Sequence, residues 1–375
     1  MTMKILISMG LADGSLKSLI APLAMLGNVD KILIVRDRQG PALPKVVYFT
    51  PPSWSAGRPV IKTLIKLALL MQLSLKERPS VIHGYLLVPN GILAFIAGKL
   101  TGRKIGVSLL AGPVELIMLT FLMKGGPTGR YAYNRPFPEV TGINRFLVSL
   151  LKRFHFITVT GNYTKTFLIS NRIPAGKISI IPHAIDPVDC PVGTPKEYDA
   201  IFVGRLARVK HIETFIRALE IVRAGRPSVR AGIIGTGPEM EALKALSERL
   251  DLSHTIDFLG YVPEVYSWYN RARMSVIASE REGFPYSAME SLSCGCPVIA
   301  SNCGDITDVL IDDFNGVIVD DYHDSAAFAG EITRLLDDPA RLARMSLNAV
   351  KSMEAVNKAK VTGIWAGIMK QLEGS

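Results

Sequence analysis

Two glutamates, Glu282 and Glu290, are the first side chains whose type and spacing could do chemistry. They lie in residues 279–300, whose pattern predicts the end of a strand, a loop, a short helix and another strand. Glu282 precedes this helix and Glu290 lies about one turn inside it, so both carboxylates can accept hydrogen bonds from hydroxyl groups of one ligand. The alternative is that Glu282 caps the helix and Glu290 is a solvated helix residue.

Residues between these glutamates predict a phosphate site. Gly283 permits a close approach of the backbone to a ligand, and the helix is expected to begin near Ser287. Ligands of open α/β sheets bind beyond the carboxyl ends of the strands. Free amides of Ser287 and Ala288 would there present a partial positive charge to a phosphate.

Cations are predicted at the end of a second strand. Residues 200–203 run into Gly204 and Arg205, and Lys210 follows five residues later. A planar guanidinium and a compact ammonium suit the clamping of a diphosphate. The alternative is that both cations are simply solvated, as single cations at strand ends usually are.

A third turn contains Gly235 and Gly237 after the predicted strand 230–234. The pair is only a G-x-G motif, because Met240 occupies the place of the third glycine of the dinucleotide fingerprint. This departure argues against a nicotinamide or flavin enzyme. The N-terminal turn that contains Gly14 lacks the fingerprint too, so its glycines indicate a tight turn near a ligand or strand–helix packing.

The elements that position these residues alternate along the chain. Short β-branched runs are separated by longer helical patterns, which is typical of βαβ units around a parallel sheet. We therefore expect the α/β class, with two Rossmann-like domains. The predicted strands are 4–9, 31–35, 45–49, 81–82, 104–109 and 156–159 in the first half, and 200–203, 230–234, 255–258, 274–278, 297–301 and 316–319 in the second.

A domain boundary is expected near residue 190. Residues 189–199 are rich in proline, glycine and polar side chains, as interdomain connections commonly are. We expect one domain over residues 1–190 and a second over 191–357. One more helix is expected in the C-terminal segment 358–375, crossing back to pack on the N-terminal domain.

Charge is unevenly distributed over the 375 residues, whose net charge is +10. Residues 1–190 hold 23 Lys and Arg against 8 Asp and Glu, whereas the remainder is net acidic. The basic half favours an anionic partner, either a membrane leaflet, a lipid phosphate or a nucleic acid. Nucleic acid is the least favoured because no nucleic-acid motif accompanies the charge. The spacing of the four cysteines fits neither a zinc site nor a disulfide framework.

In order and spacing, these motifs resemble the retaining glycosyltransferases of family 4, which have the GT-B fold. The resemblance implies two Rossmann-like domains facing a cleft. The resemblance rests on Gly204-Arg205 with Lys210, on the turn that begins at Gly235, and on Glu282-Gly-Phe with seven residues between Glu282 and Glu290. It spans residues 177–321, and the first 176 residues match only in pattern.

This resemblance implies a nucleotide-sugar donor bound to the C-terminal domain, as a co-substrate. Arg205 and Lys210 would neutralise its diphosphate, and with Glu282 they would be the catalytic residues. Glu290 would bind the ribose, and Glu282 the hydroxyls of the transferred sugar. No cofactor or metal would be required, because protein cations stabilise the leaving group.

Backbone groups complete the implied donor site. Amides of Gly283 and Phe284, with those at the start of the following helix, would hold the sugar and the distal phosphate. The turn that contains Tyr261 and Val262 sits where the family usually contacts the base.

The N-terminal domain would bind the acceptor, and here one family residue is missing. Many members have a histidine after the strand predicted at 104–109, where this chain reads Leu110-Ala-Gly-Pro. The acceptor-side candidates are Gly14, His83 and Glu115. Glu115 can instead be a buried carboxylate held by amides, and His83 an ordinary core or surface histidine.

Apolar surface ringed by cations is expected in the same domain. The helical stretch 60–75 carries Lys62 and Lys66, and the loop 124–137 contains two Arg and two Tyr. Either these features contact an anionic membrane that holds a lipid-linked acceptor, or they are a core helix with solvated lysines and a mobile loop. We expect a cytoplasmic protein, at the inner face of the membrane if it binds lipid.

Three functions compete. The first is a retaining hexosyltransferase that moves a sugar from a nucleotide sugar to a hydroxyl, on a lipid-linked or cell-envelope glycan in polysaccharide biosynthesis. The second is a sugar-nucleotide epimerase of the same architecture, which would release its product without an acceptor. The third is a non-catalytic nucleotide-sugar-binding protein. Together Arg205, Lys210, Glu282 and Glu290 favour the transferase.

Overall fold

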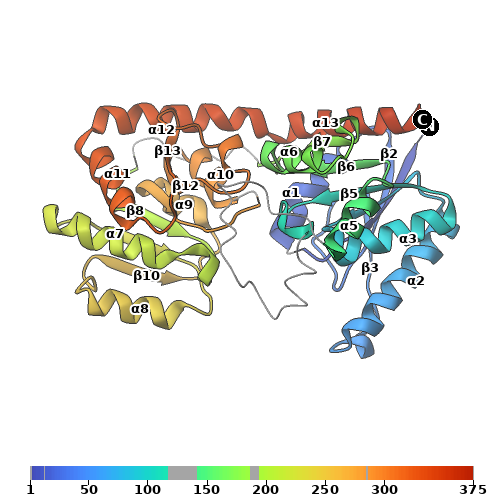
Figure 1. The fold of residues 1–375 in the computed structure, drawn as a ribbon, viewed down its shortest axis with the longest axis horizontal. Coiled ribbons are helices and arrows are strands. Elements are labelled where there is room, and N and C mark those ends of the chain that lie inside the picture. Colours follow the sequence, from blue (N-terminus) through green and yellow to red (C-terminus); the bar gives the residue numbers. More distant parts are fainter. Residues whose placement is uncertain (1, 12, 117–141, 186–193, 284–285, 375) are drawn as a thin grey trace. The chain divides into compact units, whose positions relative to one another are not determined.

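Two compact units make up the chain in this computed structural model (Figure 1). Among the described residues, the first unit holds those up to Ala184 and from Val356 onward, and the second holds Ile185–Ala355. Each unit is built on one parallel sheet, so the prediction of two Rossmann-like domains is confirmed. The structure describes residues 2–11, 13–116, 142–185, 194–283 and 286–374.

The first unit alternates strands and helices as the sequence pattern predicts. Its strands are β1 (Met3–Ser8), β2 (Val29–Val35), β3 (Val46–Phe49), β4 (Val81–Tyr85), β5 (Lys104–Leu109), β6 (Phe156–Val159) and β7 (Ile178–Ile180). Its helices are α1 (Asp13–Ala24), α2 (Pro59–Glu77), α3 (Ile92–Thr101), α5 (Ile143–Leu151), α6 (Asn162–Ser170) and α13 (Lys358–Glu373), with the short turns η1 (Ser53–Ser55), η2 (Leu87–Gly91) and η3 (Ala175–Lys177). Every strand predicted in this half is present, and β7 is an addition.

The sheet of the first unit runs in the order β3-β2-β1-β4-β5-β6-β7. Alternate side chains of β1 enter different clusters: Ile5 and Ile7 pack with α1 and α13, whereas Leu6 packs with α2 and α3. Because both faces of the sheet are buried, its strands read as nearly continuous apolar runs.

Helix α13 completes the core of the first unit from the far end of the sequence. Trp365 is 2% exposed, and its ring lies edge-on to His83, with centroids 5.7 Å apart. Asn357 caps the helix by accepting the amide hydrogen of Lys360 at 3.0 Å. The last helix therefore belongs to the unit in which the chain begins.

The second unit has the same alternation. Its strands are β8 (Tyr198–Val203), β9 (Ala231–Ile234), β10 (Ile256–Gly260), β11 (Ala272–Ile277), β12 (Val298–Ser301) and β13 (Gly316–Val319). Its helices are α7 (Ile212–Gly225), α8 (Met240–Arg249), α9 (Val265–Asn270), α10 (Tyr286–Ser293), α11 (Ser325–Asp337) and α12 (Pro339–Met353), with the turns η4 (Arg208–Lys210) and η5 (Ile306–Asp308); a further turn, η6 (Glu354–Val356), leads into α13.

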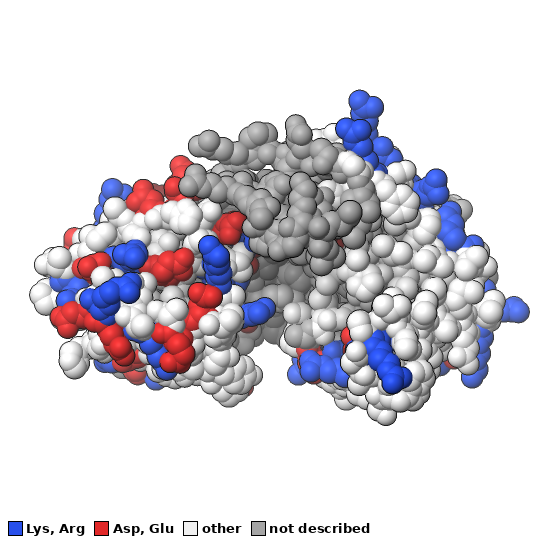
Figure 2. All heavy atoms as spheres, turned by 60° about the horizontal axis from the view of Figure 1, so that its bottom comes forward, with Lys and Arg blue, Asp and Glu red and all other residues white. Residues whose placement is uncertain are grey.

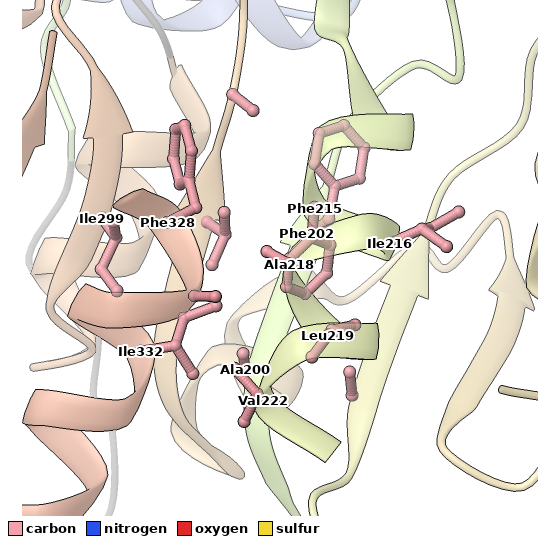
Figure 3. Close-up of a cluster of buried hydrophobic side chains, with 14 of the residues drawn as sticks. Ala200, Phe202, Phe215, Ile216, Ala218, Leu219, Val222, Ile299, Phe328 and Ile332 are labelled. Atoms are coloured by element: carbon pink, nitrogen blue, oxygen red, sulfur yellow. The ribbon is translucent and has the colours of Figure 1, made fainter. Parts of the chain in front are cut away.

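The second sheet runs in the order β10-β9-β8-β11-β12-β13, so strand order reverses between β8 and β11. Phe215 of α7 and Phe328 of α11 are buried with Phe202 of β8 in one cluster over the sheet (Figure 3). A second cluster, which includes Tyr198 and Tyr269, packs with α9. These cores fix where the loops at the carboxyl ends of β8 and β11 emerge.

Candidate active site

The reversal between β8 and β11 brings two loops together at one edge of the second sheet. The loop after β8 carries Gly204, Arg205 and Lys210, and the loop after β11 carries Glu282 and Gly283. Ligands of open α/β sheets bind in the crevice beyond the carboxyl ends of the strands at such a reversal. The topology therefore places the predicted cations and carboxylate where a ligand is expected.

Lys210 and Glu282 form an ion pair between these loops. Nζ of Lys210 lies 2.5 Å from Oε1 of Glu282, and the hydroxyl of Ser279 donates to the same oxygen at 2.7 Å. The side chains are 23% and 10% exposed, so the pair is largely shielded from water. Oε2 of Glu282 accepts no hydrogen bond from the described residues, which leaves it for a hydroxyl donor.

The backbone at Arg205 is fixed at this edge of the sheet by the next residue, Leu206. The side chain of Leu206 is buried in the core, and its amide donates to the carbonyl of Thr236 at 3.0 Å. Arg205 itself is exposed and forms no ion pair with any residue that the structure describes. Its charge is therefore available to an anion.

Gly235 and Gly237 allow the loops after β8 and β9 to touch. A Cβ on Gly235 would lie 1.9 Å from the carbonyl oxygen of Gly204, and one on Gly237 would lie 2.1 Å from that of Leu206. The amide of Gly235 also donates to the carbonyl of Gly260 at 2.7 Å. Packing within the protein alone thus requires both glycines, whatever a ligand adds.

Glu290, the second predicted carboxylate, lies on α10. Burial raises its pKa to about 7, and no described residue donates a hydrogen bond to it. Ser287 is half-buried at the start of the helix, and Ala288 has no exposed surface, which does not favour direct ligand contact by Ala288. Phe284, named in the prediction, lies outside the described residues.

Tyr261 and Val262 follow β10, which is the edge strand two places from β8. Tyr261 is 77% exposed, whereas Val262 is half-buried. An exposed aromatic ring beside a strand end can stack on a flat ligand group such as a base.

Glu115 is buried among backbone amides of the first unit. It is 1% exposed, and its carboxylate accepts the amide hydrogens of Leu87 and Ala111, each at 2.7 Å. Burial raises the pKa of Glu115 to about 7. This environment matches the alternative of a carboxylate held by amides, and these amides come from the loops after β4 and β5.

His83 is a core side chain. It is 2% exposed, its Nε2 lies 2.7 Å from the hydroxyl of Ser108, and its ring stacks on Phe156 with centroids 5.3 Å apart. Burial lowers the pKa of His83 to about 3, so the ring is neutral. Gly14, by contrast, is exposed in the first turn of α1, and a Cβ there would meet nothing within 4 Å.

The second unit coincides with a known family pattern. Residues 192–352 match the family model described as glycosyl transferases group 1. This group 1 segment runs from just before β8 into α12 and includes every donor-side residue discussed above.

Curated relatives resemble the group 1 segment. A D-inositol 3-phosphate glycosyltransferase from Thermobispora bispora is 35% identical over 162 residues, which cover 40% of this chain and 38% of that protein. A poly(glycerol-phosphate) alpha-glucosyltransferase from Bacillus subtilis is 29% identical over 195 residues, which cover 51% of this chain and 29% of that protein. The chain thus spans less than half the length of these relatives.

Solved structures resemble the whole chain. Anabaena Alr3699/HepE in complex with UDP has a TM-score of 0.75 at 17% identity, over 99% of this chain and 100% of that one. Sucrose-phosphate synthase from Thermosynechococcus elongatus has a TM-score of 0.76 at 18% identity, over 99% of each chain. At such identities the likeness shows the fold alone, and the predicted GT-B fold is confirmed.

An aromatic and charged cluster beside Lys210 is absent from the sequence prediction. The ring of His211 contacts those of Tyr322 and His323, with centroids 4.6 and 4.7 Å apart, and its Nδ1 lies 3.1 Å from a carboxylate oxygen of Glu213. In the sequence, the position of His211 directly after Lys210 is the signal that could have indicated this cluster. Among the described residues, no three His, Cys, Asp or Glu side chains are grouped so that they could hold a metal ion.

Gly304 is a second position that the sequence prediction misses. Its φ is +59°, and a Cβ there would lie 1.8 Å from the carbonyl oxygen of Glu282. The next residue, Asp305, donates its amide to the carbonyl of Gly283 at 3.2 Å. The loop after β12 therefore supports the backbone that carries Glu282.

Over the described residues, no helix is both long and apolar enough to span a bilayer. The basic loop 124–137 lies outside the described residues.

Proposed function

We propose that this protein is a retaining hexosyltransferase of family 4, which moves a sugar from a nucleoside diphosphate sugar to a hydroxyl group. The observation that carries the proposal is the ion pair between Lys210 and Glu282 at the reversal of the second sheet. Both residues lie in the group 1 segment. A cation that could bind a diphosphate thus lies beside a carboxylate that could bind sugar hydroxyls, at the carboxyl ends of two adjacent strands.

The donor site follows from the charges of these loops. Arg205 and Lys210 would pair with the diphosphate, while Oε2 of Glu282 would accept a hydroxyl of the sugar. Glu290 would accept the ribose hydroxyls, which are the hydrogen-bond donors that its half-buried carboxylate lacks among the described residues. We propose a uridine nucleotide, because HepE was solved with UDP and with UDP-glucose.

In this mechanism the protein stabilises the diphosphate leaving group and supplies no nucleophile of its own. The acceptor oxygen bonds to the anomeric carbon on the face from which the bond to the diphosphate breaks, and the acceptor proton passes to a diphosphate oxygen. Negative charge grows on the diphosphate during this step, beside Arg205 and Lys210. Prearranged donors of this kind typically contribute about 10²–10³-fold in rate each. In this proposal the donor binds without a metal ion.

The acceptor side is proposed from charge. The first half of the chain holds 23 Lys and Arg against 8 Asp and Glu. We propose a lipid-linked or cell-envelope glycan as acceptor, presented to the protein at the cytoplasmic face of a membrane. Glu115 and His83 are left out of this acceptor site, because both are buried and already bonded within the protein.

Calorimetry with nucleotides in the presence of EDTA tests the proposal. UDP and UDP-hexoses are expected to bind, GDP and ADP to bind weakly, and Arg205→Ala to reduce UDP affinity by at least about tenfold. Failure of all the nucleotides to bind would overturn the proposal, and binding that needs a divalent metal would remove its metal-free part.

Product analysis separates the two other functions. Purified protein with a bound UDP-hexose is incubated with and without membrane extract containing lipid-linked glycans. Transfer is expected only with the extract. An epimerase would convert the free donor without any acceptor, and a binding protein would return the donor unchanged in both cases.

A further inference from the structure

The N-terminal end of α2 projects from the first unit. Its buried side chains begin at Lys66 and continue with Leu70 and Leu73, which pack toward the sheet and α3. The first two turns of the helix, together with η1 before it, extend past this contact (Figure 1). They form a tip, which we define as residues 54–64.

Apolar side chains are exposed over this tip. Trp54 is 60% exposed, Val60 72%, Ile61 38% and Leu64 60%. At 100° per residue, Leu64 lies on the side of α2 opposite the buried Leu73. Exposed apolar groups this close together mark an interaction site more often than single exposed residues do.

The charge around the tip has one sign. No acidic residue occurs between Asp37 and Glu77, and these two carboxylates are already paired, with Lys66 at 2.7 Å and with Lys4 at 2.9 Å. Arg58 lies within the tip and is exposed. In Figure 2, the surface of the first unit shows Lys and Arg in several places and hardly any Asp or Glu.

We propose that the tip docks the protein on a lipid bilayer that contains anionic lipids. Trp54, Val60 and Leu64 would enter the boundary between headgroups and acyl chains, while Arg58 and Lys62 would lie against the lipid phosphates. This deepens the proposed function, since it presents the protein to a lipid-linked acceptor, but it does not depend on the transfer chemistry.

A bilayer fits this surface better than a second copy of the chain. A symmetric contact would bring the basic tip of one copy against the basic tip of the other, because a two-fold interface uses the same patch on both copies. No acidic side chain of the tip could offset this repulsion. Anionic lipid supplies the missing negative charge.

Trp54 reports directly on docking. The other two tryptophans are Trp365, which is buried, and Trp268, whose ring lies under the guanidinium of Arg271 at 3.9 Å. Full-length protein is mixed with vesicles of pure phosphatidylcholine, or with vesicles containing phosphatidylglycerol. Emission is expected to shift to shorter wavelength and the protein to sediment with the anionic vesicles, and both effects are expected to weaken in high salt.

Matched charge substitutions test the location. Leu64→Glu is expected to reduce vesicle affinity by about tenfold or more. The control is Leu347→Glu on α12, where an equally apolar side chain is 77% exposed, and its vesicle affinity is expected to stay that of the native protein. Thermal melting checks that both variants fold, and calorimetry with UDP checks that each retains the nucleotide affinity of the native protein.

Each result decides one question. No binding to anionic vesicles, or equal loss in both variants, would overturn docking by the tip. Concentration-dependent dimers that Leu64→Glu dissolves, without vesicle binding, would show that a second copy covers the tip. UDP binding without vesicle binding would leave the proposed function intact while the docking proposal fails.

Discussion

Lys210 and Glu282 are 72 residues apart in sequence, yet their side chains bond across the loops that follow two adjacent strands. Before a ligand binds, the charge of each side chain neutralises that of the other. Binding of a diphosphate would place a second anion beside Lys210 and free Glu282 to accept hydroxyl groups. The pair is therefore the place where donor binding and protein stability should be linked.

Substitution of Lys210 by Ala should leave Glu282 buried without its cation. We expect the protein to remain folded, with a loss of about 1–3 kcal/mol in unfolding free energy, and transfer to fall by about 10²–10³-fold. Initial rates and thermal melts measure both effects. Arg208→Ala, an exposed cation in the same loop, is the control, and equal losses in the two variants would contradict a specific role for Lys210.

The raised pKa of Glu290 predicts a pH dependence of stability. A native pKa of about 7 lies above the usual 4.5, so the folded protein binds more protons between these values, and stability falls as pH rises through this window. Glu290→Gln should remove that loss and be more stable at pH 8 by about 1–3 kcal/mol. Urea unfolding at pH 5 and pH 8 measures the difference, and an unchanged difference between native and variant protein would contradict it.

The same residue predicts a pH dependence of binding. If the ionised carboxylate of Glu290 accepts ribose hydroxyls, affinity for UDP-glucose should rise as pH increases through about 7. Glu290→Gln should bind more weakly above pH 7 and show a flatter profile. Calorimetry from pH 6 to pH 8 tests this, and parallel profiles in both proteins would remove Glu290 from the ribose site.

Two glycine substitutions should have very different effects on stability. Gly235→Ala would place a Cβ 1.9 Å from the carbonyl oxygen of Gly204, so we expect a loss of at least about 2 kcal/mol in stability and of UDP binding. Gly14→Ala meets open space in a helix and should be neutral or stabilising by up to about 1 kcal/mol. Chemical denaturation compares them. Reduced transfer by a stable Gly14→Ala variant would support a ligand contact there.

The lowered pKa of His83 predicts acid sensitivity. A native pKa of about 3 lies below the usual 6.5, so the unfolded chain binds the extra proton and stability falls as pH decreases from 6.5 toward 3. His83→Asn is expected to be less stable at pH 7, to lose less stability between pH 7 and pH 5 than the native protein, and to retain the native UDP affinity. Identical pH slopes would contradict a buried neutral ring.

Most strands could be predicted because both faces of each sheet are buried, which leaves apolar runs such as that of β1. Strand β7 was missed because three residues show no periodicity. The positions of Lys210 and Glu282 at neighbouring strand ends were predictable, but their mutual bond was not, since it depends on the path of two loops. The contact of Gly304 with Glu282 was equally hidden, because the residues share no motif.

The acceptor-side residues show a further limit of prediction from the sequence. A sequence marks Glu115 and His83 as chemically capable, but burial and bonding to Leu87 and Ser108 depend on packing that no local pattern encodes. For Glu115, the alternative of a buried carboxylate could be stated in advance, and only the structure identifies its amide partners.

The return of α13 to the first unit has a consequence for synthesis on the ribosome. Strands β1 to β6 emerge early, yet the face that holds His83 and Phe156 stays uncovered until Trp365 has been translated. The second unit, encoded between the two parts, has its full set of strands and helices before then. The core of the first unit can therefore be completed only after the second unit has been translated, and removal of α13 would expose the rings of His83 and Phe156.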